Sequence, residues 1–349
     1  MKLEDIPADR QAKFRFSRKP LHALNDIQRS ALDQIKHKIQ DQYAYEEIEC
    51  FCGQTQDILV GRYDRYGLPH WSRLCGNCGL IRTSPRLSEA SYHDFYEQHF
   101  VQLHYGIPAV DEAFALSRVT IMNHPANGME LLNTLRPLVD LRESRRVLEI
   151  GCGAGWTLVP LKDAGLAVAG CDYDSRQVAL GRKLFGLDLI AGGVEQVSAS
   201  GQKFDLIITI NLLEHILDLR GLLRQAHDLL DDNGLFYVMT PGLFHFVSQM
   251  YPSLQYQLMI YHTYLFNEWN LEYVLGACGF QRVRCDRFIT SVWRKTADGR
   301  NLAHVDFHVP VVDAFLKQYG DTKRQSGLGA LKSWTRERGL WSRRSDSNR

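Results

Sequence analysis

The sequence predicts an α/β fold, with a mostly parallel sheet covered by helices on both faces, in the second half of the chain. Short apolar and β-branched runs alternate with helical segments from residue 146 onward. A turn with three glycines follows the first of these runs directly and precedes a helical segment. Such alternation is typical of βαβ units, whose strands lie parallel in one sheet. A small cysteine-bearing module and additional helices precede this domain.

The expected strands and helices follow one another in a regular order. The strand candidates RVLEI, AVAGCD, LDLIAG, FDLIITI and GLFYVMT begin at residues 146, 167, 187, 204 and 234. The helical candidates TLVPLKDAG, SRQVALGRKLF and LRGLLRQAHDLL begin at residues 157, 175 and 219. Near-continuous apolar runs of this length indicate strands that are buried on both faces, as in parallel sheets.

Composition and charge limit what the protein is expected to bind. Of the 349 residues, 45% are apolar and 23% are charged, and 41 Lys and Arg nearly balance 40 Asp and Glu. A net charge of +1 provides no global field for nucleic acid or an anionic membrane. The first twenty residues are too charged for a secretory signal, and no run of eighteen apolar residues occurs. We therefore expect a cytoplasmic protein without a membrane span.

The character of the chain changes several times along its length. A helical pattern gives way to cysteines, glycines and aromatics after residue 47, and helical periodicity returns after residue 87. The end of the chain is rich in Arg, Lys, Ser and Gly, which favours a solvated tail over a phosphate-binding one. We expect five parts: a helical arm (1–47), a cysteine module (48–87), a helical connector and cap (88–140), a cofactor-binding domain (141–290) and a C-terminal extension (291–349).

The glycine turn is the most informative motif. Glu149 ends the first strand candidate, and Gly151, Gly153 and Gly155 follow at alternate positions. Glycines there permit a tight turn and let a ligand approach the backbone closely. The GxGxG spacing differs from the GxGxxG of nicotinamide-binding turns. Because the preceding carboxylate would repel a pyrophosphate, the motif argues against a nicotinamide oxidoreductase and favours a ligand with a cationic amino-acid end.

An aspartate at the end of the second strand candidate complements this turn. Asp172 follows Gly155 by 17 residues, where a carboxylate can accept hydrogen bonds from both ribose hydroxyls of a nucleoside. Taken alone, Asp172 equally suits an ordinary turn, whereas with the glycine turn it predicts a nucleoside site. The neighbouring Asp174 is better placed as the N-cap of the following helix.

These motifs resemble those of class I S-adenosylmethionine-dependent methyltransferases. VLEIGCGAG, VAGCDYDS and FDLIITINLLEHILDLRGLLRQAHDLLDDNGLFYVMTPG occur in the family's order, and HTYLFNEWNLEYVLGACGF resembles its closing segment. The resemblance covers residues 141–290 and implies a Rossmann-like sheet with S-adenosylmethionine as the cofactor. The chain departs from the commonest pattern in having Glu149 where an aspartate is usual.

The resemblance also implies a set of cofactor-binding residues. Glu149 and the first two glycines of the turn would hold the methionine part, and Asp172 the ribose. Residues after the third strand candidate would lie along the adenine, and residues after the fourth would lie beside the sulfonium. The full set is Glu149, Gly151, Gly153, Gly155, Asp172, Tyr173, Val194, Glu195, Asn211 and Leu212.

Four of the eight cysteines fall in one short segment. Cys50-x-Cys52 and Cys75-x2-Cys78 have the layout of a zinc ribbon, and glycines after three of them suit zinc knuckles. Four thiolate ligands would leave no open position, so the expected zinc is structural. Four buried free thiols are the other interpretation. The remaining cysteines lie in apolar runs and are expected to be reduced.

The spacing of the first cysteine pair leaves the ligand set open. One residue between Cys50 and Cys52 is fewer than usual, so His70 or His93 could replace Cys50. The segments CFCG and CGNCGLIRTSPRLSEASYHDFYEQHF resemble the small zinc module placed before some bacterial methyltransferases of sugar and polysaccharide pathways. The resemblance implies a module that covers the substrate side of the sheet.

Methyl transfer from a sulfonium is an in-line displacement, so positioning and water exclusion carry most of the catalysis. If a base is needed, His215 lies just beyond the fourth strand candidate, and His262 and Tyr264 lie in a segment able to close over the acceptor. Helix capping and loop packing are the alternative roles of Glu214 and His215. Related enzymes with an extra glutamate and a second histidine here bind a divalent metal, but Asn211 replaces that glutamate, which argues against a catalytic metal.

The aromatic and Met-rich stretch of residues 243–262 suits either a core helix pair or an acceptor-binding lid.

The sequence favours a methyltransferase that acts on a small molecule, a sugar or glycan precursor. A nucleic-acid or protein methyltransferase that grips its substrate with the zinc module is the first alternative, and the near-zero charge speaks against it. A non-catalytic adenosyl-binding scaffold is the second, and the acceptor atom and oligomeric state stay open.

Overall fold

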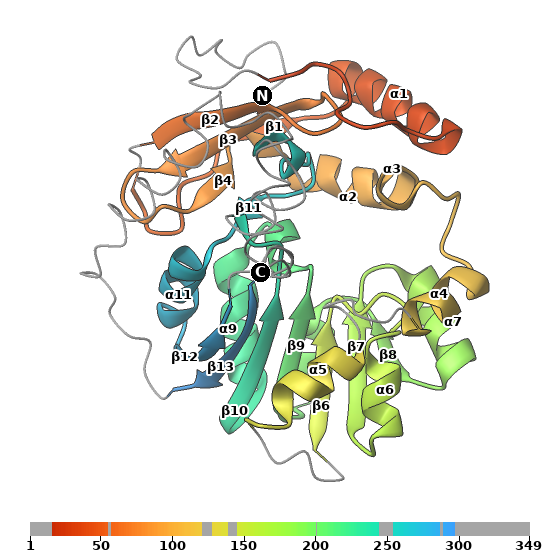
Figure 1. The fold of residues 1–349 in the computed structure, drawn as a ribbon, viewed down its shortest axis with the longest axis vertical. Coiled ribbons are helices and arrows are strands. Elements are labelled where there is room, and N and C mark those ends of the chain that lie inside the picture. The colour runs from red at the N-terminus through yellow and green to blue at the C-terminus, as the bar shows by residue number, and fades with distance from the viewer. Residues whose placement is uncertain are drawn as a thin grey trace, which may run out of the picture.

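The computed structural model describes residues 16–54, 57–120, 128–138, 145–199, 201–243, 254–286 and 289–296. Two bodies are visible: a layered α/β domain and, above one edge of its sheet, an N-terminal lobe built from a small antiparallel sheet and helices (Figure 1). The basic tail expected at the end of the chain lies outside the described residues. Within them, no helix has both the length and the apolarity needed to cross a membrane.

The α/β domain is organised by a mixed seven-stranded sheet in the order β12-β13-β10-β9-β6-β7-β8. The four pairings from β10 to β8 are parallel, and β13 runs antiparallel to both of its neighbours. This confirms the predicted α/β sheet and adds two final strands that the motifs did not delimit. The strands are β6 (Arg146–Ile150), β7 (Ala167–Asp172), β8 (Asp188–Ala191), β9 (Phe204–Ile210), β10 (Leu230–Met239), β12 (Phe280–Cys285) and β13 (Thr290–Lys295).

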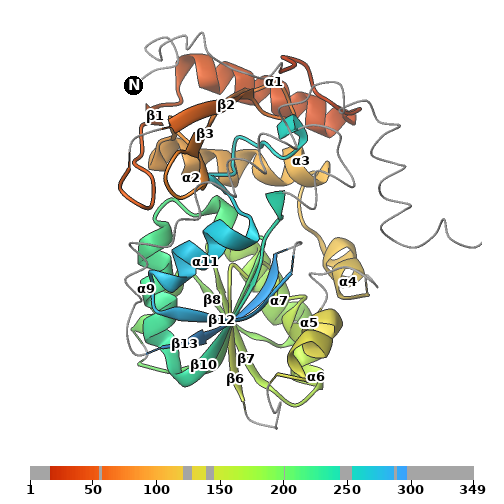
Figure 2. The same cartoon turned by 60° about the vertical axis from the view of Figure 1, so that its left-hand side comes forward.

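Helices cover both faces of this sheet, because side chains alternate from one face to the other along each strand. In β9, Ile207 packs into one cluster with α9 and α11, whereas Leu206 and Ile208 pack into another with α5, α6 and α7. Figure 2 shows these two groups of helices on opposite sides of the strands. The helices are α5 (Gly128–Leu135), α6 (Leu158–Asp163), α7 (Ser175–Phe185), α8 (Val194–Ser198), the 3-10 turn η2 (Leu213–His215), α9 (Leu219–Leu229) and α11 (Glu268–Gly276).

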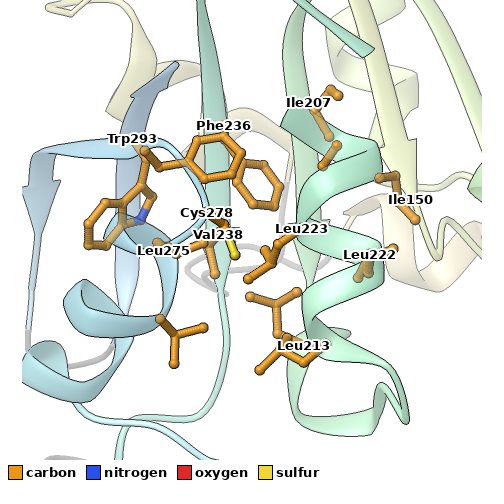
Figure 3. Packing of buried hydrophobic residues seen from close by; sticks show 14 of the residues in the cluster. Ile150, Ile207, Leu213, Leu222, Leu223, Phe236, Val238, Leu275, Cys278 and Trp293 are labelled. Carbon is orange, nitrogen blue, oxygen red and sulfur yellow. The ribbon is translucent and has the colours of Figure 1, made fainter. Parts of the chain in front are cut away.

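The core beneath α9 and α11 is dense and aromatic. Phe236 and Trp293 lie side by side against Leu223 of α9 (Figure 3), and all three side chains are fully buried. The indole N–H of Trp293 donates to the Ser291 hydroxyl at 2.8 Å, so burial leaves no polar group unpaired there. Each such apolar side chain contributes about 1.5–3 kcal/mol of hydrophobic free energy. This core fixes β9 and the turn that follows it.

Local capping explains where the helices begin. The Asp174 side chain accepts from the backbone of Arg176 and Gln177, which confirms its predicted role as the N-cap of α7. Asn25 and Asn267 each form a capping box at the start of α1 and α11. Such caps satisfy backbone N–H groups that the first helical turn leaves without partners.

The N-terminal lobe comprises residues 16–54 and 57–105 together with residues 254–265. Its four-stranded antiparallel sheet has the order β11-β4-β3-β2. The predicted helix in the arm forms as α1, whose Leu32, Ile35 and Ile39 are buried. The elements are α1 (Asp26–Asp41), β1 (Tyr45–Glu46), β2 (Asp57–Tyr63), β3 (Pro69–Cys75), β4 (Ile81–Thr83), β5 (Arg86–Leu87), α2 (Glu89–Gln98), α3 (Phe100–Tyr105) and β11 (Tyr264–Leu265), with α4 (Glu112–Thr120) following as a connector.

The two bodies are joined by a strand that leaves the α/β domain. β11 comes after β10 in the chain, yet it pairs with β4 of the N-terminal lobe, Tyr264 opposite Arg82. The backbone N–H of Thr263 donates to the carbonyl of Glu214 at 2.6 Å, next to the end of β9. The lobe therefore lies against the edge of the sheet where the parallel strands end (Figure 1).

A buried carboxylate holds the returning segment in place. Asp64 is fully buried and accepts from the backbone N–H groups of Tyr66, Leu68 and Ile260 at 2.8–3.0 Å. Of the aromatic stretch 243–262, residues 254–262 form the 3-10 turn η3 (Leu254–Tyr256) and irregular backbone, and residues 244–253 lie outside the described residues. The described part is thus packed into the lobe and does not form a helix pair.

Candidate functional site

The glycine turn lies between β6 and α6 at the carboxyl edge of the sheet. Gly151 has a φ of +73°, and a Cβ there would come within 2.7 Å of Leu212 Cδ1. The backbone N–H groups of Gly151 and Cys152 both donate to the carbonyl of Cys171 at 2.8 and 3.1 Å, which ties the turn to β7. Glycine is therefore required at this position by both conformation and space. The turn brings its backbone to the loop that follows β9.

Glu149, at the end of β6, is buried beneath this turn. Burial raises the pKa of its carboxyl to about 8, partly offset by a hydrogen bond with Thr157. Its Oε2 has no hydrogen-bond partner among the described residues. A buried carboxylate oxygen without a partner costs free energy, and a cationic ligand group would remove that cost. The residues present therefore fit the amino group of an S-adenosylmethionine molecule.

Asp172 stands beside the turn at the end of β7. Its two oxygens accept from the backbone N–H groups of Gly153 and Asp174, both at 2.8 Å. Burial raises the pKa of this carboxyl, and the two backbone hydrogen bonds lower it. Each carboxylate oxygen retains a further lone pair, so Asp172 can still accept from two ribose hydroxyls. The geometry agrees with the expected nucleoside contact.

The remaining cofactor candidates line the same edge. Tyr173 is 74% exposed and donates through its hydroxyl to Glu195 Oε1 at 2.9 Å, while Val194 is buried at the start of α8. Asn211 follows β9 with a φ of +49° and donates its backbone N–H to the carbonyl of Met239. Leu212 reaches toward Gly151, as described above. The strand ends of β6, β7, β8 and β9 thus gather all ten residues along the carboxyl edge of the sheet, where open α/β sheets bind ligands.

His215, which follows β9, contacts residues of the N-terminal lobe. Its Nδ1 lies 2.7 Å from the hydroxyl of Tyr96 and 3.1 Å from the carbonyl of Tyr261. The imidazole of His262 lies next to it, with ring centroids 4.8 Å apart. Burial lowers the pKa of His215 to about 4 and also lowers the pKa of His262 well below its usual value, so both rings are neutral at pH 7. Two of the three predicted catalytic residues are therefore neighbours.

Tyr264 has different surroundings. It is buried in β11, and its ring packs against Phe266 with the centroids 6.1 Å apart. Its apolar neighbours belong to the cluster that contains Cys50, Cys75 and Cys78. No hydrogen bond joins Tyr264 to either histidine among the described residues. The structure thus brings His215 and His262 together without Tyr264.

Several aromatic residues of this site are not evident from the sequence. Phe100 and His104 of α3 stack with centroids 5.2 Å apart, and His104 Nδ1 lies 2.9 Å from the hydroxyl of Tyr261. Tyr261 in turn stacks on His215, with centroids 5.7 Å apart. Tyr96, Phe100 and His104 recur at four-residue spacing, a pattern that indicates no more than a helix face. Only the packing of α2 and α3 against η2 shows that these side chains point toward the same residues.

The four predicted cysteine ligands come together in the N-terminal lobe. Their sulfurs all lie within 4.8 Å of one another, and the pairs Cys50–Cys78 and Cys52–Cys75 are 3.5 and 3.6 Å apart. Tetrahedral zinc with Zn–S bonds of about 2.3 Å requires sulfurs about 3.8 Å apart, so the donor set fits this metal. The cysteines are not joined by disulfides.

The alternative histidine ligands do not belong to this cluster. His70 is buried in β3, where its Nε2 lies 3.3 Å from the Thr83 hydroxyl. His93 is exposed on α2, 3.7 Å from Glu97. The structure therefore places Cys50 with the other three cysteines, despite the short spacing of the first pair. Hydrogen bonding from the neighbouring thiols, that of Cys50 first, lowers the pKa of Cys52.

Comparison with known proteins matches the α/β domain. The family described as "Methyltransferase domain" matches residues 126–284. A ubiquinone biosynthesis O-methyltransferase of Chelativorans sp. is 29% identical over 103 residues, which cover 28% of this chain and 41% of that protein. Its counterpart from Methylocella silvestris is 25% identical over 186 residues, which cover 52% of this chain and 62% of that protein. The chain thus spans about half the length of these relatives.

Among solved structures, the 1,6-didemethyltoxoflavin N1-methyltransferase of Burkholderia thailandensis shares 18% identity and has a TM-score of 0.43. The similarity covers 69% of this chain and 100% of that one. The family match, the mixed sheet with antiparallel β13 and the geometry around Glu149 and Asp172 agree with one another. Residues 126–284 are therefore a class I S-adenosylmethionine-dependent methyltransferase domain.

Proposed function

We propose that the protein is an S-adenosylmethionine-dependent methyltransferase that acts on a small molecule, a sugar or glycan precursor. The observation that carries the proposal is the buried carboxylate of Glu149, whose Oε2 lacks a partner beneath a glycine turn. This arrangement suits the cationic amino-acid end of the cofactor and repels a pyrophosphate. The ten cofactor candidates line one edge of the sheet, as such a ligand requires.

The bound cofactor would supply an electrophilic methyl group on a sulfonium. Glu149 would hold its amino group, Asp172 its ribose, and Val194 with Glu195 its adenine. Asn211 and Leu212 would border the reacting centre. His215 and His262 would face the acceptor from the opposite side, and the N-terminal lobe would exclude water from both. Tyr264 would contribute indirectly, by helping to hold β11 in its position.

The sugar class is supported by the polar groups that surround His215. The hydroxyl of Tyr96 bonds to His215, and the hydroxyl of Tyr261 bonds to the imidazole of His104. Such groups suit an acceptor with several hydroxyls. The stacked rings of Phe100 and His104 also suit a flat aromatic acceptor, which is the second candidate. The net charge of +1 gives the protein no basic field, so it does not support a nucleic-acid substrate.

We further propose that the four cysteines hold a structural zinc ion. The zinc ion would hold the turn between Cys50 and Cys52, which contains Phe51, against the methyltransferase domain. Arg220 of α9 donates to the carbonyl of Phe51 at 2.8 Å and places its guanidinium 4.0 Å above the Phe51 ring. Tyr273 of α11 contacts the same ring edge to face. The five-part division of the chain is retained as a proposal, with residues 254–265 contributing to the lobe.

Calorimetric titration with S-adenosylhomocysteine tests the central proposal. We expect micromolar binding to the wild type, strong weakening in Asp172→Ala, and unchanged binding in Asp188→Ala, which removes an exposed aspartate of β8. Binding of NADH in place of S-adenosylhomocysteine would overturn the proposal. Binding of the product analogue without turnover of any sugar, glycan or phenolic acceptor would favour the scaffold alternative.

A further inference from the structure

Arg118 is a half-buried arginine on the connector helix α4, which lies beside α7 of the α/β domain (Figure 1). The central carbon of its guanidinium lies 5.9 Å from the centroid of the Trp156 ring, one residue after the glycine turn. Among the described residues, Arg118 forms no hydrogen bond and no ion pair. The stack on Trp156 is therefore its one printed polar contact in that part of the chain.

The donors of this guanidinium are costly to leave without acceptors. A guanidinium carries five N–H donors and keeps its positive charge in proteins. Nε of Arg118 is buried and has no hydrogen-bond partner among the described residues. A cation–π contact recovers part of the lost hydration, but it supplies no hydrogen-bond acceptor to Nε. A negatively charged ligand would supply both the acceptor and the opposite charge.

A row of rings connects Arg118 with the acceptor side of the site. Trp156 packs against Phe114 with the ring centroids 6.3 Å apart. Phe114 packs against Tyr105 at 5.1 Å, and Tyr105 packs edge to face against His104 at 4.6 Å. The guanidinium is thus linked, through side chains of α3 and α4, to the histidines described above.

His104, at the end of this row, is surrounded by positive charge. Its ring is exposed, and Nε2 forms no hydrogen bond among the described residues. Burial, followed by the neighbouring His215, Arg65 and Arg118, lowers the pKa of His104 to about 3. No carboxylate of the described residues opposes this effect. His104 is therefore neutral at pH 7, and the charge of Arg118 is not compensated on this side.

The same electrostatic effects separate Arg118 from the amino-acid end of the cofactor site. Burial and a side-chain hydrogen bond are the largest causes of the pKa shift of Glu149, followed by the charge of Asp172, and no arginine contributes. Burial raises the pKa of Tyr105, the charge of Arg118 lowers it, and the charge of Asp172 raises it. Arg118 therefore lies beyond the expected ribose contact, toward His104.

We propose that Arg118 binds an anionic group of the acceptor, a phosphoryl or carboxylate group, with His104 as a second hydrogen-bond partner. The inference rests on the proposed methyltransferase function, because it concerns the acceptor of that reaction. A guanidinium donates two parallel hydrogen bonds to either group, and Nε2 of a neutral imidazole adds a third. The proposal narrows the acceptor to an acidic small molecule, since a neutral glycoside or phenol would leave Arg118 without a partner.

Titration of the full chain with inorganic phosphate, and separately with acetate, tests the proposal at pH 7 and constant ionic strength. Histidine labelled with 13C at Cε1 reports binding by NMR, and the signal of His104 is the one lost in His104→Gln. We expect a saturable shift of this signal in the wild type with at least one of the two anions.

Variants of Arg118 should change this binding in a graded way. Arg118→Gln should weaken anion binding by about 10-fold or more, because a charge-assisted hydrogen bond is lost. Arg118→Lys keeps the charge without the two-donor geometry and should bind with intermediate affinity. The matched control Arg136→Gln, an exposed arginine directly after α5, should bind as the wild type does. The absence of a saturable shift with both anions, or equal binding by Arg118→Gln, would overturn the proposal.

A second titration distinguishes the acceptor from the cofactor, whose amino-acid end also carries a carboxylate. Anion binding should persist in the complex with S-adenosylhomocysteine, and Arg118→Gln should bind S-adenosylhomocysteine as tightly as the wild type. Loss of anion binding in that complex, with weaker S-adenosylhomocysteine binding by Arg118→Gln, would assign Arg118 to the cofactor and overturn the proposal. Failure of S-adenosylhomocysteine to bind the wild type would contradict the methyltransferase function, whereas the anion titration of the free protein still decides whether Arg118 binds anions.

Discussion

The hydroxyl of Tyr96 lies 2.7 Å from Nδ1 of His215, and the two residues belong to different bodies of the molecule. Tyr96 is carried by α2 of the N-terminal lobe, whereas His215 follows β9 of the methyltransferase domain. The contact therefore makes the orientation of an imidazole in one body depend on the packing of the other.

Removing the Tyr96 hydroxyl should slow the reaction with the acceptor without changing the affinity for the cofactor. We expect Tyr96→Phe to lower kcat about threefold to tenfold, because one buried hydrogen bond is worth about 0.5–1.5 kcal/mol. The ring and its packing against Phe100 remain. Steady-state kinetics with the identified acceptor measure the effect, and S-adenosylhomocysteine affinity serves as the control. An equal loss of cofactor affinity would contradict the assignment.

Glu149 should make cofactor binding depend on pH. Burial raises its pKa to about 8, so below pH 8 the carboxyl of the free protein is protonated. A cationic ligand favours the carboxylate, so binding releases a proton and affinity rises as pH increases toward 8. Calorimetry at pH 6.5 in buffers of different ionisation enthalpy measures the released proton. Glu149→Gln should bind more weakly and release none.

The raised pKa of Glu149 also predicts that the stability of the unliganded protein falls as pH rises toward 8. The folded pKa lies above the usual value of 4.5, so the contribution of Glu149 to stability is present below about pH 4.5 and is lost as pH rises to about 8. Without ligand, Glu149→Gln should unfold at a higher denaturant concentration than the wild type at pH 8. The difference should shrink toward pH 5. A difference independent of pH would show that the carboxyl does not titrate in this range.

Two glycine variants can separate the effect of the left-handed backbone conformation from the effect of the space available for a Cβ atom. Gly151→Ala adds a Cβ that meets Leu212 at a φ of +73°, whereas Gly201→Ala adds one at +69° with nothing within 4 Å. Both should lose about 1–2 kcal/mol of stability from the left-handed backbone. Only Gly151→Ala should displace Leu212 and weaken S-adenosylhomocysteine binding. Equal binding by the two variants would remove the close approach as the reason for the glycine.

Zinc removal should loosen the N-terminal lobe selectively. Cys75→Ser removes one of the four ligands, so we expect less than about half an equivalent of zinc at the cysteines and a lobe more sensitive to proteolysis. Cys285→Ser, which changes a half-buried cysteine of β12 outside the cluster, should keep its zinc. Elemental analysis and limited proteolysis of both variants distinguish these outcomes. Full zinc content in Cys75→Ser would contradict the ligand set.

Local patterns predicted the sheet well because strand, turn and cap signals lie within a few residues of one another. The glycine turn, Asp172 and the Asp174 cap all followed from neighbours in the chain. Tyr96, His104 and Tyr261 could not be recognised, since their roles depend on α2 and α3 packing against η2. The zinc-ribbon layout was visible, but only the folded knuckle at Phe51 showed that Cys50 can join the other thiols.

The pairing of β11 with β4 also has a consequence for how the chain folds during synthesis. β4 ends at Thr83, whereas its partner begins at Tyr264, so the edge of the small sheet stays open while most of the methyltransferase domain emerges from the ribosome. A contact of such sequence separation is slow to form. The N-terminal lobe is therefore completed only after β6 to β10 of the other body have been made, although most of the lobe is made first. A nascent chain that stalls before residue 265 carries an exposed strand edge on β4, which other chains can pair with.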